Sequence, residues 1–279
     1  MSLSDVTQAR TTRRSRVYSG RIRRSLLGVG LRFPTVFLHL PKCGGTSLSE
    51  ALYATVPIQK RVGVIDALAT RRAAALMEFG EDDVWRCHDD LEYGHFTFDL
   101  RERLLLTHGC WNTALIHGHV LLTDRVRRHL LERYKLLTLM RDPISRTISN
   151  YRMAVAAGIA DPDPEVWLGS AIARAHCTTY LRYLSGQHHV DPEAEPESLN
   201  RALDALDQFS LIGFIQNLET FSTQFEKTFG AKLTLNRYNQ ARGPEIELTG
   251  PQRDRLHDMC AADSAVYAEA LKRWNRPLA

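Results

Sequence analysis

The stretch that most constrains this chain runs from Phe37 to Leu48 and reads FLHLPKCGGTSL. An apolar, strand-like segment leads into a lysine and a glycine pair, and two hydroxyl residues then open a helix. Backbone amides at such a turn, together with the positive end of the helix dipole, bind anions well. The glycines let the chain approach an anion closely, and Lys42 adds a positive charge. The pattern predicts a site for a phosphorylated nucleotide; a glycine-rich turn without a ligand is the alternative.

The order of residues separates this loop from a Walker A loop. In a Walker A loop the lysine follows the glycines and directly precedes Ser or Thr. Here Lys42 precedes the glycines, and no glycine lies four or five residues upstream of it. This order argues against an ATP-dependent kinase, although such an enzyme would share the fold. The loop supplies six candidate cofactor-binding residues: Lys42, Cys43, Gly44, Gly45, Thr46 and Ser47.

A second motif follows an apolar segment that ends at Met140 and reads RDPISRTISNY from Arg141 to Tyr151. Asp142 followed by a proline is typical of a helix start, with a capping carboxylate before the first helical residue. Ser149 lies in the helix that this start predicts. An arginine that binds two phosphate oxygens at once is a strong anion ligand. The alternative is an arginine that merely ends a strand beside a solvated helix face.

The third motif is His-Gly-His at His117 to His119, at the end of another apolar segment. If the backbone stays extended through the glycine, both imidazoles project from the same side. Histidine titrates near neutrality and can take a proton from an attacking alcohol. A polar strand end and half of a metal site are the alternatives, but the chain has no paired metal-ligand spacing of the common kinds.

Together these motifs resemble the sulfotransferases that use 3'-phosphoadenosine 5'-phosphosulfate (PAPS). The resemblance implies that the Lys42 loop holds the 5'-phosphosulfate and that Arg141 and Ser149 hold the 3'-phosphate. The His-Gly-His segment resembles the uronosyl 2-O-sulfotransferase branch, which implies His119 as general base with His117 assisting or substituting. Arg242 lies where related enzymes close a loop over the nucleotide.

The resemblance implies transfer of a sulfuryl group from PAPS to a hydroxyl of a glycan or glycolipid. Lys42 would stabilise the charge that grows on the leaving phosphate, 3'-phosphoadenosine 5'-phosphate (PAP) would be released, and no metal would be required. A kinase-like phosphotransferase with a P-loop and a non-catalytic nucleotide-binding protein are the alternative functions. A thermal-shift comparison of ATP with PAP would test the phosphotransferase, and failure to transfer sulfate to a panel of glycans would favour the non-catalytic protein.

Charge divides the chain into two parts. Residues 1–32 hold eight arginines and one acid, which leaves 28 Lys and Arg against 31 Asp and Glu in residues 33–279. We expect 1–32 to be a flexible basic arm and 33–279 to be the sulfotransferase domain. The arm suits an anionic membrane surface, or it is a solubilising leader. Nucleic acid is not an expected partner, because the body lacks a basic patch interleaved with aromatics.

The remaining composition suggests a location. No apolar run approaches the roughly 20 residues that cross a bilayer, and the five cysteines are scattered without a disulfide pattern, which suits a reducing compartment. We expect a cytoplasmic protein, with a peripheral position at the inner membrane face as a further possibility through the arm.

Strands alternate with helices along the body, which predicts a single α/β domain: a P-loop-type parallel sheet flanked by helices, the sulfotransferase fold. Ligands of such sheets bind at the carboxyl ends of the strands, where all three motifs fall. Residues 81–93 are expected to be irregular with room for a strand, and 189–197 to be a flexible insertion. The predicted strands are 35–40, 114–116, 134–140 and 210–214, and the predicted helices 47–55, 71–79, 99–106, 123–133, 143–158, 218–229 and 251–274.

Overall fold

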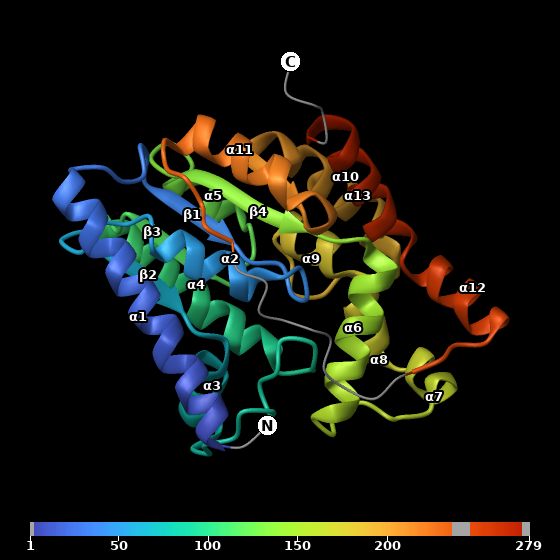
Figure 1. The fold of residues 1–279 in the computed structure, drawn as a ribbon. Coiled ribbons are helices and arrows are strands. Elements are labelled where there is room, and N and C mark those ends of the chain that lie inside the picture. The colour runs from blue at the N-terminus through green and yellow to red at the C-terminus, as the bar shows by residue number, and fades with distance from the viewer. Residues whose placement is uncertain (1–2, 236–245, 275–279) are drawn as a thin grey trace.

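The computed structural model describes residues 3–235 and 246–274, without the side chains of residues 3–11 and Thr46. Its centre is one five-stranded sheet in the order β2-β3-β1-β4-β5, and every adjacent pair is parallel (Figure 1). The predicted α/β domain with a parallel central sheet is therefore confirmed. The strands are β1 (Thr35–Leu38), β2 (Val62–Ile65), β3 (Leu115–Gly118), β4 (Lys135–Met140) and β5 (Phe209–Phe214).

Helices surround the sheet. Short 3-10 turns cover Pro192–Ala194, Leu206–Gln208 and Ile215–Asn217. The α-helices in the described part of the chain are α1 (Leu3–Leu27), α2 (Gly45–Tyr53), α3 (Ala67–Phe79), α4 (Gly94–Cys110), α5 (Asp124–Leu130), α6 (Pro143–Ala156), α7 (Pro164–Leu168), α8 (Ala171–Cys177), α9 (Thr179–Ser185), α10 (Glu195–Ala205), α11 (Leu218–Phe229), α12 (Gly250–Met259) and α13 (Ala261–Trp274).

The central strand β1 is buried on both faces, and its side chains alternate between two cores. Val36 and Leu38 join a core that includes residues of α4, α5, α9, α10 and α13. Phe37 faces the other way, into a core with the apolar sides of α2 and α11. A third cluster joins α6, α7, α8 and α12 around the stacked rings of Tyr151 and Trp167. The sheet is thus covered on both faces, as parallel sheets require.

The strand order places the functional motifs at a topological switch point. β1 and β4 are neighbours, yet the chain passes from β1 to β2 on one side of the sheet and from β4 to β5 on the other. In open α/β sheets a crevice forms where connections diverge in this way. Lys42 follows β1 and Arg141 follows β4, so the two predicted phosphate ligands lie on either side of this divergence.

Several segments differ from the sequence expectation. The segment 81–93, which is described throughout, holds no strand. The strand that the sequence analysis did not predict is β2, a four-residue strand at the edge of the sheet. Because its Val64 is exposed, β2 has little apolar signal. Residues 189–197 are not a loose insertion, because they lead into α10, which buries Ser198 and Ala202 and packs on α9. The last predicted helix is two helices, broken at Cys260.

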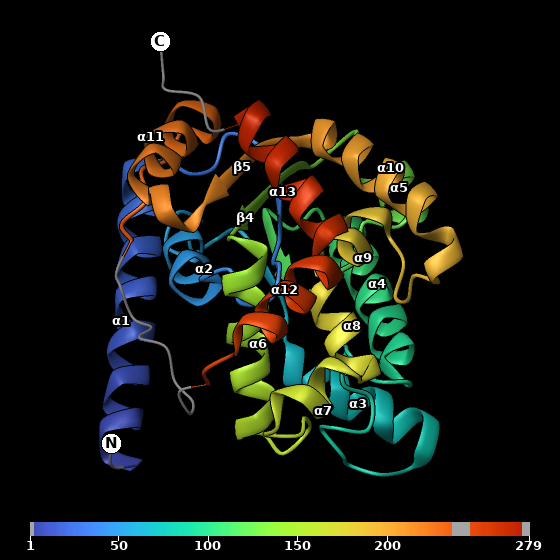
Figure 2. The ribbon, with the colours of Figure 1, turned by 90° about the vertical axis from the view of Figure 1, so that its right-hand side faces the viewer.

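Residues 3–27 form the helix α1, where the sequence analysis expected a flexible arm. α1 packs along α2 (Figures 1 and 2), and a Cβ at Gly20 would lie 2.8 Å from the Cβ of Ala54. The guanidinium of Arg21 donates to the carbonyl oxygens of Val56 (3.1 Å) and Lys60 (2.7 Å). None of the helices in the described ranges combines the length and apolar composition needed to span a bilayer.

Candidate functional site

The loop between β1 and α2 turns sharply at two residues with positive φ. Gly44 has φ 75° and is the N-cap of α2, and Lys42 has φ 64°. Left-handed backbone at a non-glycine residue is uncommon, costs of order 1–3 kcal/mol and concentrates at functional sites. Gly44 provides no side chain to cap α2, so the first amides of this helix are left for another acceptor. The predicted strand–turn–helix cradle is present.

Gly45 explains why the loop needs its second glycine. A Cβ at this position would lie 1.7 Å from Nε2 of His39, so the imidazole occupies the space that any side chain would need. His39 therefore lies in contact with the loop backbone. The sequence analysis assigned it no role, although its place one residue after the strand, in alternation with Phe37, was a usable signal.

Cys43 contributes only backbone to the loop. Its side chain is fully buried, 3.3 Å from the hydroxyl oxygen of Tyr180, and burial raises the pKa of its thiol to about 11. The same hydroxyl accepts a hydrogen bond from the backbone N–H of Arg141 at 2.9 Å and donates to its carbonyl oxygen. Tyr180 thus joins the two predicted phosphate-binding motifs.

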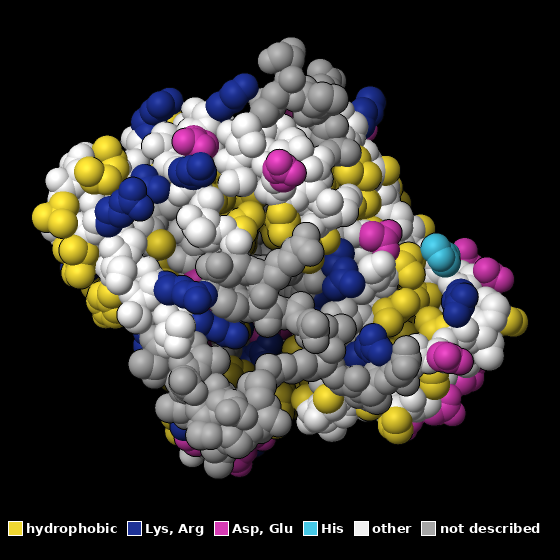
Figure 3. Space-filling view, viewed as in Figure 1, with side chains coloured by type: hydrophobic (Ala, Val, Ile, Leu, Met, Phe, Trp, Pro, Cys, Tyr) yellow, Lys and Arg dark blue, Asp and Glu magenta, His cyan; other side chains and the backbone are white. Residues whose placement is uncertain are grey.

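Lys42 and Arg141 converge on one space. Nζ of Lys42 lies 3.6 Å from Sδ of Met153 on α6, and Ser149 lies one turn earlier on the same helix face. Burial lowers the pKa of Lys42, and the positive charge of Arg141 lowers it further. Lys and Arg side chains lie on both sides of the hollow beside α2 and α6 (Figure 3). Within residues 3–235 and 246–274, neither cation has a carboxylate partner.

The start of α6 follows the predicted capping. The carboxylate of Asp142 accepts from the N–H of Ser145 at 2.8 Å, and Pro143 is the first helical residue. Arg146, the second arginine of the motif, is fully buried and donates to Thr179 and to Asp263. It therefore supports the fold and is not exposed to a ligand, whereas Ser149 is half-buried.

His117 and His119 both contact the ring of His39, which confirms that they project from one side. The ring centroids of His39 and His119 are 4.2 Å apart, and those of His39 and His117 are 5.1 Å apart. Nε2 of His117 lies 3.0 Å from Nδ1 of His39, and Nδ1 of His117 lies 2.5 Å from the Tyr53 hydroxyl. Tyr53, on α2, is a further site residue that the sequence analysis missed.

Hydrogen bonding distinguishes the two histidines as bases. Nδ1 of His119 is 2.7 Å from the carbonyl oxygen of His39; a carbonyl only accepts, so Nδ1 carries the hydrogen and Nε2 holds the lone pair. No residue in the described ranges pairs with this Nε2, whereas both ring nitrogens of His117 are engaged. Of the two, His119 is therefore the imidazole with an unengaged lone pair.

Burial keeps the cluster neutral. It lowers the pKa of His117 to about 3, with a smaller effect from His119. Burial also lowers the pKa of His119 well below its usual value, assisted by the charge that His39 would carry, and it does the same for His39, assisted by His117. Nη1 of the buried Arg101 donates to the carbonyl oxygen of His119 at 3.2 Å and fixes the backbone there.

One of the predicted ligands is not described, and another is described only in part. Arg242 lies outside the described residues. Thr46 is placed in α2 by its backbone, and its side chain is not described. Ser47 is half-buried in the first turn of α2.

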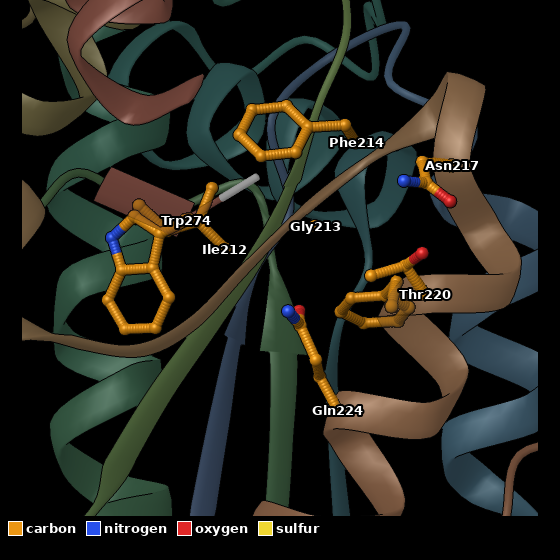
Figure 4. A pocket seen from close by; sticks show the side chains of 8 residues that line it. Ile212, Gly213, Phe214, Asn217, Thr220, Gln224 and Trp274 are labelled. Carbon is orange, nitrogen blue, oxygen red and sulfur yellow. The ribbon is translucent and has the colours of Figure 1, made fainter. Parts of the chain in front are cut away.

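A small, half-open pocket lies elsewhere, between β5 and the helices α11 and α13 (Figure 4). Apolar, amide and hydroxyl side chains line it, without any Lys, Arg or His, so it offers no charge to a nucleotide. Its lining residues are Ile212, Gly213, Phe214, Asn217, Thr220, Phe221, Gln224 and Trp274.

Comparison with known proteins adds little to this geometry. No protein-family model and no curated protein matches the chain. Among solved structures, the chain is similar to one from the molecular and structural characterisation of the PezAT chromosomal toxin–antitoxin system of the human pathogen Streptococcus pneumoniae. That match has a TM-score of 0.30 and 13% identity, and covers 91% of this chain and 97% of that chain. At this level of similarity it supports no conclusion about fold or function.

Proposed function

We propose that this chain is a PAPS-dependent sulfotransferase that transfers a sulfuryl group to a hydroxyl of a carbohydrate-type acceptor. The observation that carries the proposal is the convergence of Lys42, Arg141 and the uncapped start of α2 on one space, beside a neutral histidine with a free lone pair. A nucleotide with a phosphate at each end of its ribose suits two separate cationic positions.

The two cations would bind opposite ends of the nucleotide. The amides of Gly45 to Ser47 and Lys42 would hold the 5'-phosphosulfate at the positive end of α2. Arg141, whose guanidinium no side chain engages in the described ranges, and the hydroxyl of Ser149 would hold the 3'-phosphate. Such preorganised donors usually account for the largest share of rate acceleration, because they are aimed at charge that develops in the transition state.

His119 would serve as the general base. The acceptor oxygen attacks the sulfur and gives its proton to Nε2 of His119; the new O–S bond forms as the bond from sulfur to the 5'-phosphate oxygen breaks and PAP leaves. Lys42 would stabilise the negative charge on that leaving oxygen. The hydrogen bond from Nδ1 to the His39 carbonyl holds the required tautomer.

His39, His117 and Tyr53 would position this base. Burial raises the pKa of Tyr53, so its hydroxyl keeps its proton, and we assign it as a hydrogen-bond donor to Nδ1 of His117. Nε2 of His117 then donates to Nδ1 of His39, and Nε2 of His39 presents its hydrogen beside Gly45. Each neutral imidazole has one N–H, so a donating Tyr53 would set the direction of every hydrogen bond in this chain.

The test is a screen of glycan and glycolipid acceptors with radiolabelled PAPS, using wild type, His119→Ala and the exposed control His129→Ala. We expect His119→Ala to lose about 10²–10⁴-fold in turnover while binding PAP with unchanged affinity in calorimetry, and His129→Ala to match wild type. Absence of PAP binding would reject the cofactor assignment. Magnesium-dependent binding of ATP in place of PAP would favour a phosphotransferase, and PAP binding without transfer to any acceptor would favour a non-catalytic protein.

A further inference from the structure

The outward face of α1 carries a row of apolar side chains. Tyr18, Ile22 and Leu26 are 56%, 47% and 83% exposed. They are spaced by four residues, so they lie one above the other on a single helix face. Leu27, the last residue of α1, and Val29, just beyond the helix end, are exposed as well.

The opposite face of α1 is anchored, so the row is held outward. Gly20 packs closely on Ala54, the residue that directly follows α2. Arg21 donates to the loop carbonyls after α2, and Arg24 donates to the carbonyl oxygen of Lys232 at 2.9 Å. The hydroxyl of Ser25 accepts from the N–H of Ile58 at 2.8 Å.

Positive charge surrounds this apolar row. Residues 12–33 contain no Asp or Glu. Arg14 lies one turn before Tyr18 in the same row, and Arg23 lies on its flank; neither has a partner among residues 3–235 and 246–274. Hydrophobic side chains gather over the C-terminal end of α1, at the left edge of Figure 3, with Lys and Arg side chains beside them.

We infer that this face of α1 docks on an anionic membrane surface. Tyr18, Ile22 and Leu26 enter the boundary between headgroups and acyl chains, while Arg14 and Arg23 bind lipid phosphates. An apolar row flanked by arginines on a folded domain is typical of an interfacial helix, and its charge is complementary to acidic lipids. A nucleic acid would match the charge but leave the apolar row in water. The site of Lys42 and Arg141 is separate, so this inference does not rest on the proposed function.

The test is co-sedimentation of the full chain with two kinds of vesicle. One contains phosphatidylcholine alone, and the other contains about 30% phosphatidylserine in addition. We expect binding only to the anionic vesicles, weakening as salt rises. Arg14→Gln and Arg23→Gln should each weaken partitioning about fivefold, and Ile22→Ser and Leu26→Ser about tenfold each. Leu68→Ser and Met77→Ser, exposed apolar residues of α3, are matched controls expected to bind like wild type.

Three outcomes would overturn the inference. The first is wild type that stays in the supernatant with anionic vesicles. The second is equal loss in the α3 controls. The third is a dimer in light scattering that dissociates in Ile22→Ser and Leu26→Ser, because the row would then be an interface between copies of the chain. Point variants are used because deleting residues 1–32 would remove packing from α2. Affinity for PAP is measured in the same variants; an unchanged value shows that the loss of vesicle binding does not arise from a change at the nucleotide site.

Discussion

Two groups of cationic side chains in this molecule differ in whether they are paired with a carboxylate. In the interior, four buried arginines each face a carboxylate: Arg71 and Arg101 share Asp89, Arg182 meets Asp90, and Arg146 meets Asp263. At the ends of β1 and β4, Lys42 and Arg141 have no such partner among the described residues, although burial and their mutual repulsion lower the pKa of the lysine.

The difference separates structural charge from charge kept for a ligand. A buried charge is expensive unless it is paired, and the interior arginines obey this rule. Two neighbouring cations without a counter-charge are unfavourable for the folded state alone, so a bound anion would relieve them. The buried histidines avoid the cost of a buried charge in another way, since they stay neutral and hydrogen-bond to one another.

The largest expected effect comes from breaking a structural pair. Arg101→Met leaves Asp89 short of a partner and removes the bond to the His119 carbonyl, so we expect unfolding free energy to fall by about 3–5 kcal/mol. Lys42→Met should leave stability unchanged or raised, because it removes an unpaired charge. Urea denaturation measures both. Equal losses in the two variants would remove the distinction between paired and unpaired cations.

A smaller effect should follow from filling the space beside the loop. Gly45→Ala places a Cβ against the His39 ring, and overpacking of this kind costs about 1–3 kcal/mol. We expect lower stability together with weaker PAP binding, since either the loop or the ring must move. Gly250→Ala, at the start of α12 with open space around it, is the control. A Gly45→Ala protein that behaves like this control would show that His39 does not restrict the loop.

A more gradual effect is expected as a pH dependence of stability from the neutral histidines. Their folded pKa values lie below the unfolded value near 6.5, so below that pH the unfolded chain binds protons that the folded chain does not. Stability should therefore fall on acidification, by up to about 1.4 kcal/mol per pH unit for each histidine. For His117 the window runs from 6.5 down to about 3. Urea unfolding at pH 7, 6 and 5 should give a shallower slope for His117→Phe, and an unchanged slope would contradict this account.

Sequence patterns predicted the sheet and the placement of the motifs because these depend on local signals. Asp142 and Pro143 encode the start of α6, and Gly230 ends α11 where expected. β2 was not predicted, because a short edge strand has only a weak hydrophobic periodicity. The helix over residues 3–27 was not predicted either, because it depends on non-local contacts, such as Gly20 against Ala54, that composition does not reveal.

The site was predictable in part for the same reason. Lys42, Arg141 and His119 follow strand ends, which the sequence marks. The choice between His117 and His119 was not predictable, because it depends on which ring nitrogen meets Tyr53 and which meets the His39 carbonyl. The structural role of Arg146 likewise appears only with Asp263, 117 residues later in the chain.

The most direct test of the central claim is calorimetric binding of PAP and of adenosine 5'-phosphate to wild type, Arg141→Ala and the exposed control Arg128→Ala. If Lys42 and Arg141 bind opposite ends of one nucleotide, Arg141→Ala should lose about 10–150-fold in affinity for PAP and keep its affinity for adenosine 5'-phosphate, which lacks the 3'-phosphate. Equal losses for both ligands, or no loss for PAP, would contradict the account.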